Sequence, residues 1–105
     1  MKNEDILFLG KLVEQPSEAP RCGDIKVAVA YKFRIEKLIR GQSNEEFLVV
    51  LIPCPDLKGD SFFTINSDYH IEATNDLEHA RSYTIYSDYG KTALLWALDI
   101  KKALE

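Results

Sequence analysis

The sequence predicts a mainly β domain: a five-stranded antiparallel Greek-key barrel with a C-terminal α-helix. Three observations lead to this fold class. Residues 25–35 alternate apolar with polar or small side chains, which is typical of a strand with one buried face. Other short apolar runs are separated by turn-forming residues, and the tail has helical spacing. A chain of 105 residues supports one hydrophobic core, so residues 1–105 are expected to form one domain.

The segment 25–35 is the strand around which the core is expected to form. Its apolar side chains share one face: Ile25, Val27, Val29, Tyr31, Phe33 and Ile35. We expect this face to lie inward. The opposite face is expected to lie in solvent and carries Lys26, Ala28, Ala30, Lys32 and Arg34. The alternation breaks at Glu36-Lys37, and such a change of phase indicates a bulge or a bend.

The remaining strands are predicted from apolar runs bounded by turns. Ile6–Val13 is a first strand, in which Gly10 indicates a bulge or the close approach of another backbone. Residues 46–52 are apolar from Phe47 onward, which predicts a central strand covered on both faces and ended by Pro53. The fourth and fifth strands are Tyr69–Ala73 and Ser82–Ser87.

The tail admits two interpretations. Thr92 can cap a helix over residues 93–104, in which Ala93, Trp96, Ala97, Ile100 and Leu104 share one face. Its content of leucine and alanine favours this helix. The competing interpretation is a sixth strand, because Trp96, Leu98 and Ile100 also alternate.

The order of these elements fits one small barrel architecture. A long bent second strand, a loop after strand one and another between strands four and five are features of the OB-fold, a partly open five-stranded Greek-key barrel. The expected fold is therefore OB-like.

Composition excludes several classes of protein. The net charge of −4 argues against a general binder of phosphate backbones. No apolar run approaches the roughly 20 residues of a membrane helix, so membrane insertion is not expected. The N-terminus lacks a signal-peptide pattern, because Glu4 and Asp5 precede an apolar run of only Ile6–Leu9.

Two cysteines are too few for a disulfide scaffold and lack the spacing of a zinc site. A tight hairpin at Gln42-Ser43 would place Cys54 near Tyr31, and Cys22 beyond the start of that strand. We therefore expect free thiols, although a single bridge remains open.

Short motifs along the chain follow the order of a known family. They are Phe8-Leu9-Gly10-Lys11 on the first strand, a strand ending at Arg40-Gly41, the segment Tyr69–Ala73, and Thr92 before the tail. In this order the chain resembles the domain shared by tissue inhibitors of metalloproteinases and the C-terminal modules of netrins. The resemblance covers nearly the whole chain and implies an OB-like fold and a binding role.

The departures from that family bear on function. In the inhibitors an N-terminal cysteine presents its amine and carbonyl to the protease zinc, whereas this chain starts Met1-Lys2-Asn3. Asp88 and Tyr89 stand where the family has a cysteine before its final helix. Protease inhibition is therefore not expected of the chain as written. The resemblance implies an extracytoplasmic location if the chain is a piece of a longer precursor.

No residue pattern predicts catalysis. Serine, threonine and cysteine lack a recognisable nucleophile context, and no phosphate-binding glycine loop is present. His70 and Glu72, with Asp68, could be metal ligands, but an outward-facing pair on a sheet is the preferred interpretation. We expect no enzyme, no metal and no cofactor.

The leading hypothesis is a non-catalytic module that binds another protein through loops at one end of the barrel. In the loop after strand one the candidate binding residues are Glu14, Ser17, Glu18 and Arg21. In the loop between strands four and five they are Asn75, Asp76, Glu78, His79 and Arg81. The alternative is an OB-fold binder of single-stranded nucleic acid or oligosaccharide. The negative net charge of the chain disfavours nucleic acid as the ligand.

Overall fold

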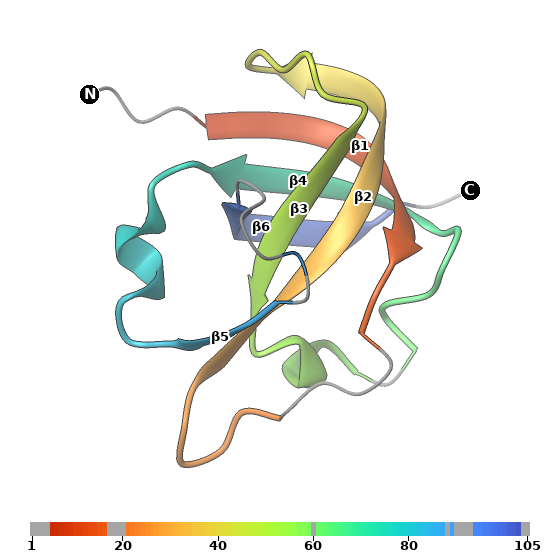
Figure 1. Cartoon of the computed structure of the whole chain (residues 1–105). Coiled ribbons are helices and arrows are strands. Elements are labelled where there is room, and N and C mark those ends of the chain that lie inside the picture. The colour runs from red at the N-terminus through yellow and green to blue at the C-terminus, as the bar shows by residue number, and fades with distance from the viewer. Residues whose placement is uncertain (1–4, 17–20, 60, 88, 90–93, 104–105) are drawn as a thin grey trace.

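The computed structural model describes residues 5–16, 21–59, 61–87, 89 and 94–103 (Figure 1). The strands are β1 (Asp5–Glu14), β2 (Val27–Arg40), β3 (Phe47–Pro53), β4 (Asp68–Thr74), β5 (Thr84–Tyr86) and β6 (Leu94–Lys102). Two short 3-10 helices, η1 (Pro55–Lys58) and η2 (Leu77–Ala80), lie in the connections. Within the described ranges no α-helix occurs, and the prediction of a mainly β protein is confirmed.

Five of the strands close into a barrel. Their order is β1-β4-β6-β3-β2, and pairing between β1 and β2 closes the ring. The order β4-β1-β2-β3 within it is that of a Greek key. The expectation of a wholly antiparallel sheet is wrong. Because β3 and β4 run in opposite directions, β6, which lies between them, is antiparallel to β4 and parallel to β3.

The predicted C-terminal helix is also wrong, since residues 94–102 form strand β6. Asp99 pairs with Glu72 and Ala97 pairs with Ala73, so Leu98 opposes no residue of β4 and forms a bulge. Because of the bulge, Ala97 and Ile100 both face the barrel interior. These two residues are three positions apart, which is also the spacing of one helix face. Ala93 and Leu104, the ends of the predicted helix, lie outside the described residues.

The barrel interior is the main core, and β1 contributes to it in the expected way. Ile6, Phe8 and Leu12 are buried. Gly10 lies so close to its neighbours that a Cβ there would stand 2.7 Å from the Phe8 ring and 3.2 Å from Phe33 Cβ. The β1–β2 register shifts between Leu9 and Gly10, which confirms the predicted bulge, and the atoms nearest to Gly10 belong to side chains and not to another backbone.

Strand β2 is long and bent. Its register against β1 shifts three times, so that Glu36 and Ile39 of β2 and Val13 of β1 have no partner. This confirms the break expected at Glu36-Lys37. After Arg40, Gly41 turns the chain with a φ of 92°, a conformation that favours glycine.

The first half of β2 is buried on both faces, contrary to expectation. Ala28 and Ala30 are covered and form a second core cluster with Val49, Leu51 and Trp96. This outer cluster lies between the barrel wall and the β4–β6 connection, which contributes Ala80, Tyr83 and Tyr89, and Leu94 of β6 also packs against it. Ile25, expected inside, is 64% exposed because it precedes the strand. The predicted central position of β3, covered on both faces, is confirmed.

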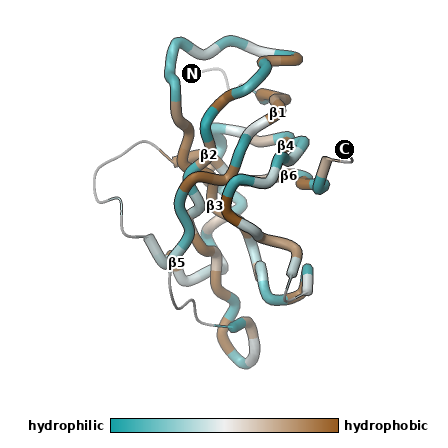
Figure 2. Tube along the Cα trace, turned by 90° about the vertical axis from the view of Figure 1, so that its right-hand side faces the viewer, coloured by the Kyte–Doolittle hydropathy of each residue, from teal (hydrophilic) through white to brown (hydrophobic). Residues whose placement is uncertain are grey.

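Strand directions give the barrel two different ends. At one end Asp5 of β1 pairs with Thr74 of β4, and we call this the Asp5 end. At the other end Pro53 of β3 pairs with Ala28 of β2, and we call this the disulfide end for the bond described below. The β2–β3 connection, at the top of Figure 2, belongs to the Asp5 end and is mostly hydrophilic.

Candidate functional site

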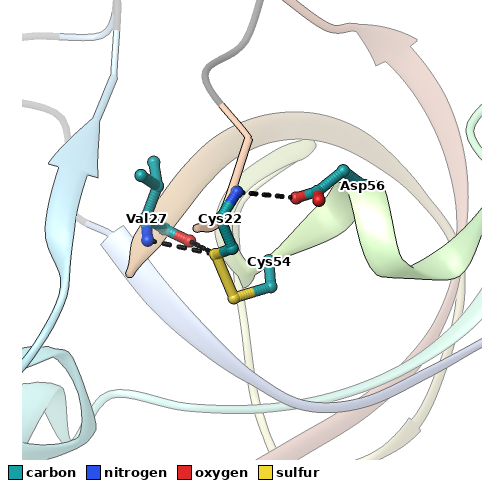
Figure 3. The surroundings of a disulfide bond; sticks show 4 residues. All are labelled: Cys22, Val27, Cys54 and Asp56. Atoms are coloured by element: carbon teal, nitrogen blue, oxygen red, sulfur yellow. Dashed lines mark hydrogen bonds between the residues drawn. A yellow bond between two sulfur atoms is a disulfide. The ribbon is translucent and has the colours of Figure 1, made fainter. Parts of the chain in front are cut away.

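The disulfide end is held by a bond between Cys22 and Cys54, so the expectation of free thiols is wrong (Figure 3). The Cα atoms are 5.3 Å apart. The Cys22 amide donates to Asp56 Oδ1 at 3.1 Å, and the Val27 amide donates to Cys22 Sγ at 3.2 Å. The bond therefore fixes the end of the β1–β2 loop to the start of η1.

Strand register explains why the bond forms. Tyr31 pairs with Val50. A tight hairpin at Gln42-Ser43 would instead place Cys54, four residues later, opposite Tyr31. The end of β2 runs past β3 and pairs only with β1. As a result Cys54 lies beside Val27, to whose carbonyl its amide donates at 2.9 Å, and not beside Tyr31.

Aromatic side chains close the disulfide end. Tyr31 stacks on Phe63 at 4.4 Å between ring centroids, and Phe62 lies 5.5 Å from Tyr69. The Tyr69 hydroxyl donates to the Phe62 carbonyl at 2.6 Å and accepts from the Thr64 amide at 2.8 Å. Burial, with a smaller effect of Asp56, raises the pKa of Tyr31 to about 12, and burial also raises the pKa of Tyr69.

The first predicted loop contributes little that the structure describes. Glu14 ends β1, where its carboxylate contacts Lys32 Nζ at 3.4 Å and accepts from the Tyr89 hydroxyl at 3.3 Å. Arg21 is exposed and precedes the disulfide. Ser17 and Glu18 lie outside the described residues.

The second predicted loop is ordered by its own side chains. Asp76 Oδ1 accepts from the Glu78 amide at 3.1 Å and so caps η2. The Arg81 guanidinium contacts the Glu78 carboxylate at 3.1 Å. The His79 ring stacks on Trp96, 6.1 Å between centroids and 16° between planes. Asn75, the first residue of the loop, is exposed at the Asp5 end.

The two predicted loops do not start from the same end of the barrel. Glu14 lies at the disulfide end, and Asn75 follows Thr74 at the Asp5 end. Nine residue steps along β1 separate these ends, roughly 30 Å at the rise of a strand. The prediction that both loops flank one end therefore holds only for the last part of the second loop, which runs along the barrel to the disulfide end, where the Thr84 amide donates to the Lys26 carbonyl at 2.8 Å.

Sequence reasoning missed the apolar residue that η2 displays. Leu77 is 41% exposed, whereas the side chains beside it serve the fold as caps or ion pairs. We call Leu77, Glu78 and Arg81 the η2 surface; the last two side chains are 70% and 79% exposed. An apolar residue within a polar loop was the signal that could have found it.

A pocket opens at the Asp5 end, and only one of its lining residues, Asn75, was predicted to be a binding residue. Its volume is about 130 Å³. The apolar lining is Ile6, Leu48 and Leu95, and the polar lining is Asp5, Gln42, Ser43 and Asn75. Gly41 allows this arrangement, because a Cβ there would stand 2.9 Å from the Asp5 carbonyl. We call this feature the end pocket.

His70 and Glu72 do not form a metal site with the side chains around them. His70 is exposed, and Glu72 accepts from Arg40 at 2.6 Å. In the described part of the chain no three His, Cys, Asp or Glu side chains come together as metal ligands.

No protein-family model, curated protein or solved structure matches this chain. The resemblance to metalloproteinase inhibitors and netrin modules therefore stays a prediction. Among the residues described, no helix is both long and apolar enough to span a bilayer.

Proposed function

We propose that this chain is a non-catalytic protein-binding module on an OB-like barrel, and that it binds its partner through the η2 surface. One observation carries the proposal: η2 is firmly held and yet exposed. The Asp76 side chain caps η2, and the His79 ring stacks on Trp96 of the barrel wall, while the Leu77 side chain is exposed.

Order without burial is what a recognition loop needs. A loop that is already ordered loses less conformational entropy when it binds, so more of the contact energy appears as affinity. Leu77 offers an apolar contact, and the Glu78–Arg81 pair beside it offers both signs of charge at the rim.

The disulfide supports the location that the resemblance implies. Disulfides persist in oxidising environments and are rare in the cytosol. The Cys22–Cys54 bond is therefore consistent with a module that works outside the cytoplasm, as the inhibitors and netrins do.

The alternative, binding of single-stranded nucleic acid or oligosaccharide, has one observation in its favour. Phe47 is 38% exposed on β3 and pairs with Arg34 of β2. Lys32 Nζ lies over the Phe47 ring, 4.8 Å from its centroid. Aromatic rings beside basic groups are the usual platform for stacked bases. However, Glu14 offsets the Lys32 charge, and the adjoining wall at Ala28 and Ala30 is covered by the chain itself.

A photo-crosslinking experiment tests the proposal. A photo-reactive amino acid replaces Leu77 in one protein and Leu98 in a matched control, since both side chains are 41% exposed. The proposal predicts a discrete, saturable adduct in native extract from position 77 only. Equal labelling from both positions would contradict it. Binding of single-stranded DNA that weakens steeply with salt, and that Phe47→Ala abolishes, would favour the alternative.

A further inference from the structure

The end pocket is too small for a whole ligand but large enough for one side chain. Small-molecule sites usually enclose about 300–1,000 Å³, whereas this pocket measures about 130 Å³. A shallower depression of about 460 Å³ adjoins it and shares Gln42 and Ser43. A group inserted into the pocket could therefore remain attached to a chain lying in the depression.

The lining specifies the kind of side chain. Ile6, Leu48 and Leu95 provide apolar walls that suit a methylene stem. Among the polar lining residues, Asp5 offers a carboxylate, and the side-chain amide oxygen of Gln42 can accept a hydrogen bond. A cationic group at the end of an aliphatic stem satisfies both parts of this lining.

We propose that the end pocket receives a lysine or arginine side chain of the protein partner. This inference rests on the proposed function, because it supplies a second contact for the same partner at the end of the barrel from which the η2 loop departs. The chain's net charge of −4 also favours a basic partner. The partner's main chain on either side of the inserted residue would lie in the adjoining depression.

The pocket is tested without the partner, using Nα-acetyl-lysine N-methylamide as the probe and protein NMR as the readout. We expect saturable shifts of the Gln42, Ser43 and Asn75 amides, with a dissociation constant in the millimolar range for so small a ligand. The Nε-acetylated probe has the same stem without the charge and should produce no such shifts. Shifts of similar size with both probes would overturn the inference.

Two variants locate the effect. Asp5→Asn keeps the shape of the side chain and removes the charge, so it should weaken binding of the lysine probe about tenfold. Asp99→Asn makes the same change on the exposed outer wall of β6 and should leave binding unchanged. Equal affinity of Asp5→Asn and wild type, with the amide spectrum of the variant showing an intact fold, would overturn the inference.

The outcomes separate this inference from the proposed function. If position 77 crosslinks to a partner and Asp5→Asn binds that partner as wild type does, the protein-binding function stands and the pocket assignment is wrong. If the lysine probe binds in the end pocket but position 77 captures no partner, the pocket is a cation site and the proposed function is wrong.

Discussion

Removing the Cys22–Cys54 bond should be among the most destabilising changes that leave the barrel core intact. The two residues are 32 positions apart. For a closed loop of that length, the chain-entropy model gives about 3.7 kcal/mol of stabilisation through the unfolded state. In a domain of this size such a loss lowers the melting temperature by roughly 15–30 °C.

The assay is urea unfolding of wild type and of the double variant Cys22→Ser/Cys54→Ser, each with and without reductant. Serine retains an acceptor for the Val27 amide, so the comparison isolates the covalent link. Wild type should lose stability when reduced, and the double variant should not respond. A wild type that is indifferent to reductant, or a double variant as stable as oxidised wild type, would refute the assigned bond.

Three further predictions concern the core. Ala30→Asp should destabilise the fold by about 3 kcal/mol or more in urea unfolding, because it buries a charge in the outer cluster. The control Leu98→Asp changes an exposed position and should destabilise the fold much less. Equal losses of stability would contradict the burial of Ala30. Gly10→Ala should cost about 1–3 kcal/mol in the same assay, since its Cβ would overlap the Phe8 ring; a neutral result would be inconsistent with the packing. The raised pKa of Tyr31 means that the folded state holds this proton more tightly than the unfolded state. The contribution of Tyr31 to stability should therefore be constant below about pH 10 and be lost between pH 10 and 12, by at most about 1.4 kcal/mol per pH unit. Tyr31→Phe should lose this part of the slope, and an unchanged slope would contradict the assignment.

The side chains that enter the barrel could be predicted from the sequence for part of the sheet. In β1, and in β2 up to Phe33, alternation marks which side chains enter the barrel, because successive residues point to opposite faces. The irregular pairing beside Gly10 could be predicted too, since a glycine inside a strand commonly marks a bulge.

The tail was misread because a bulge disguises a strand. Leu98 is the extra residue, and because of it Ala97 and Ile100, three positions apart, both point inward. On a helical wheel those two positions share a face, so local spacing alone cannot distinguish the two structures. Only the partner strand β4 resolves the ambiguity.

The disulfide and the outer cluster were missed because both depend on distant segments. Cys54 meets Cys22 only when the end of β2 runs past β3, which no local pattern shows. Ala28 and Ala30 were assigned to solvent by alternation, yet the β4–β6 connection covers them. Alanines among lysines on the outer face were the one sequence signal of that cover.

The candidate site was predicted in part. Asn75 and the η2 residues were named correctly as a loop, but their division into structural and exposed side chains depends on Trp96 of β6. The end pocket joins residues from β1, the β2–β3 connection and β6. Such a grouping follows from the closure of the barrel and not from any motif.

The affinity of the crosslinked partner for two serine variants tests the central claim most directly. Leu77→Ser removes the apolar contact of the η2 surface, and Leu98→Ser makes the same change at equal exposure on another wall of the barrel. The account predicts that Leu77→Ser weakens binding about tenfold while Leu98→Ser has no measurable effect. Unchanged affinity in Leu77→Ser would contradict the assignment of the η2 surface as the binding site.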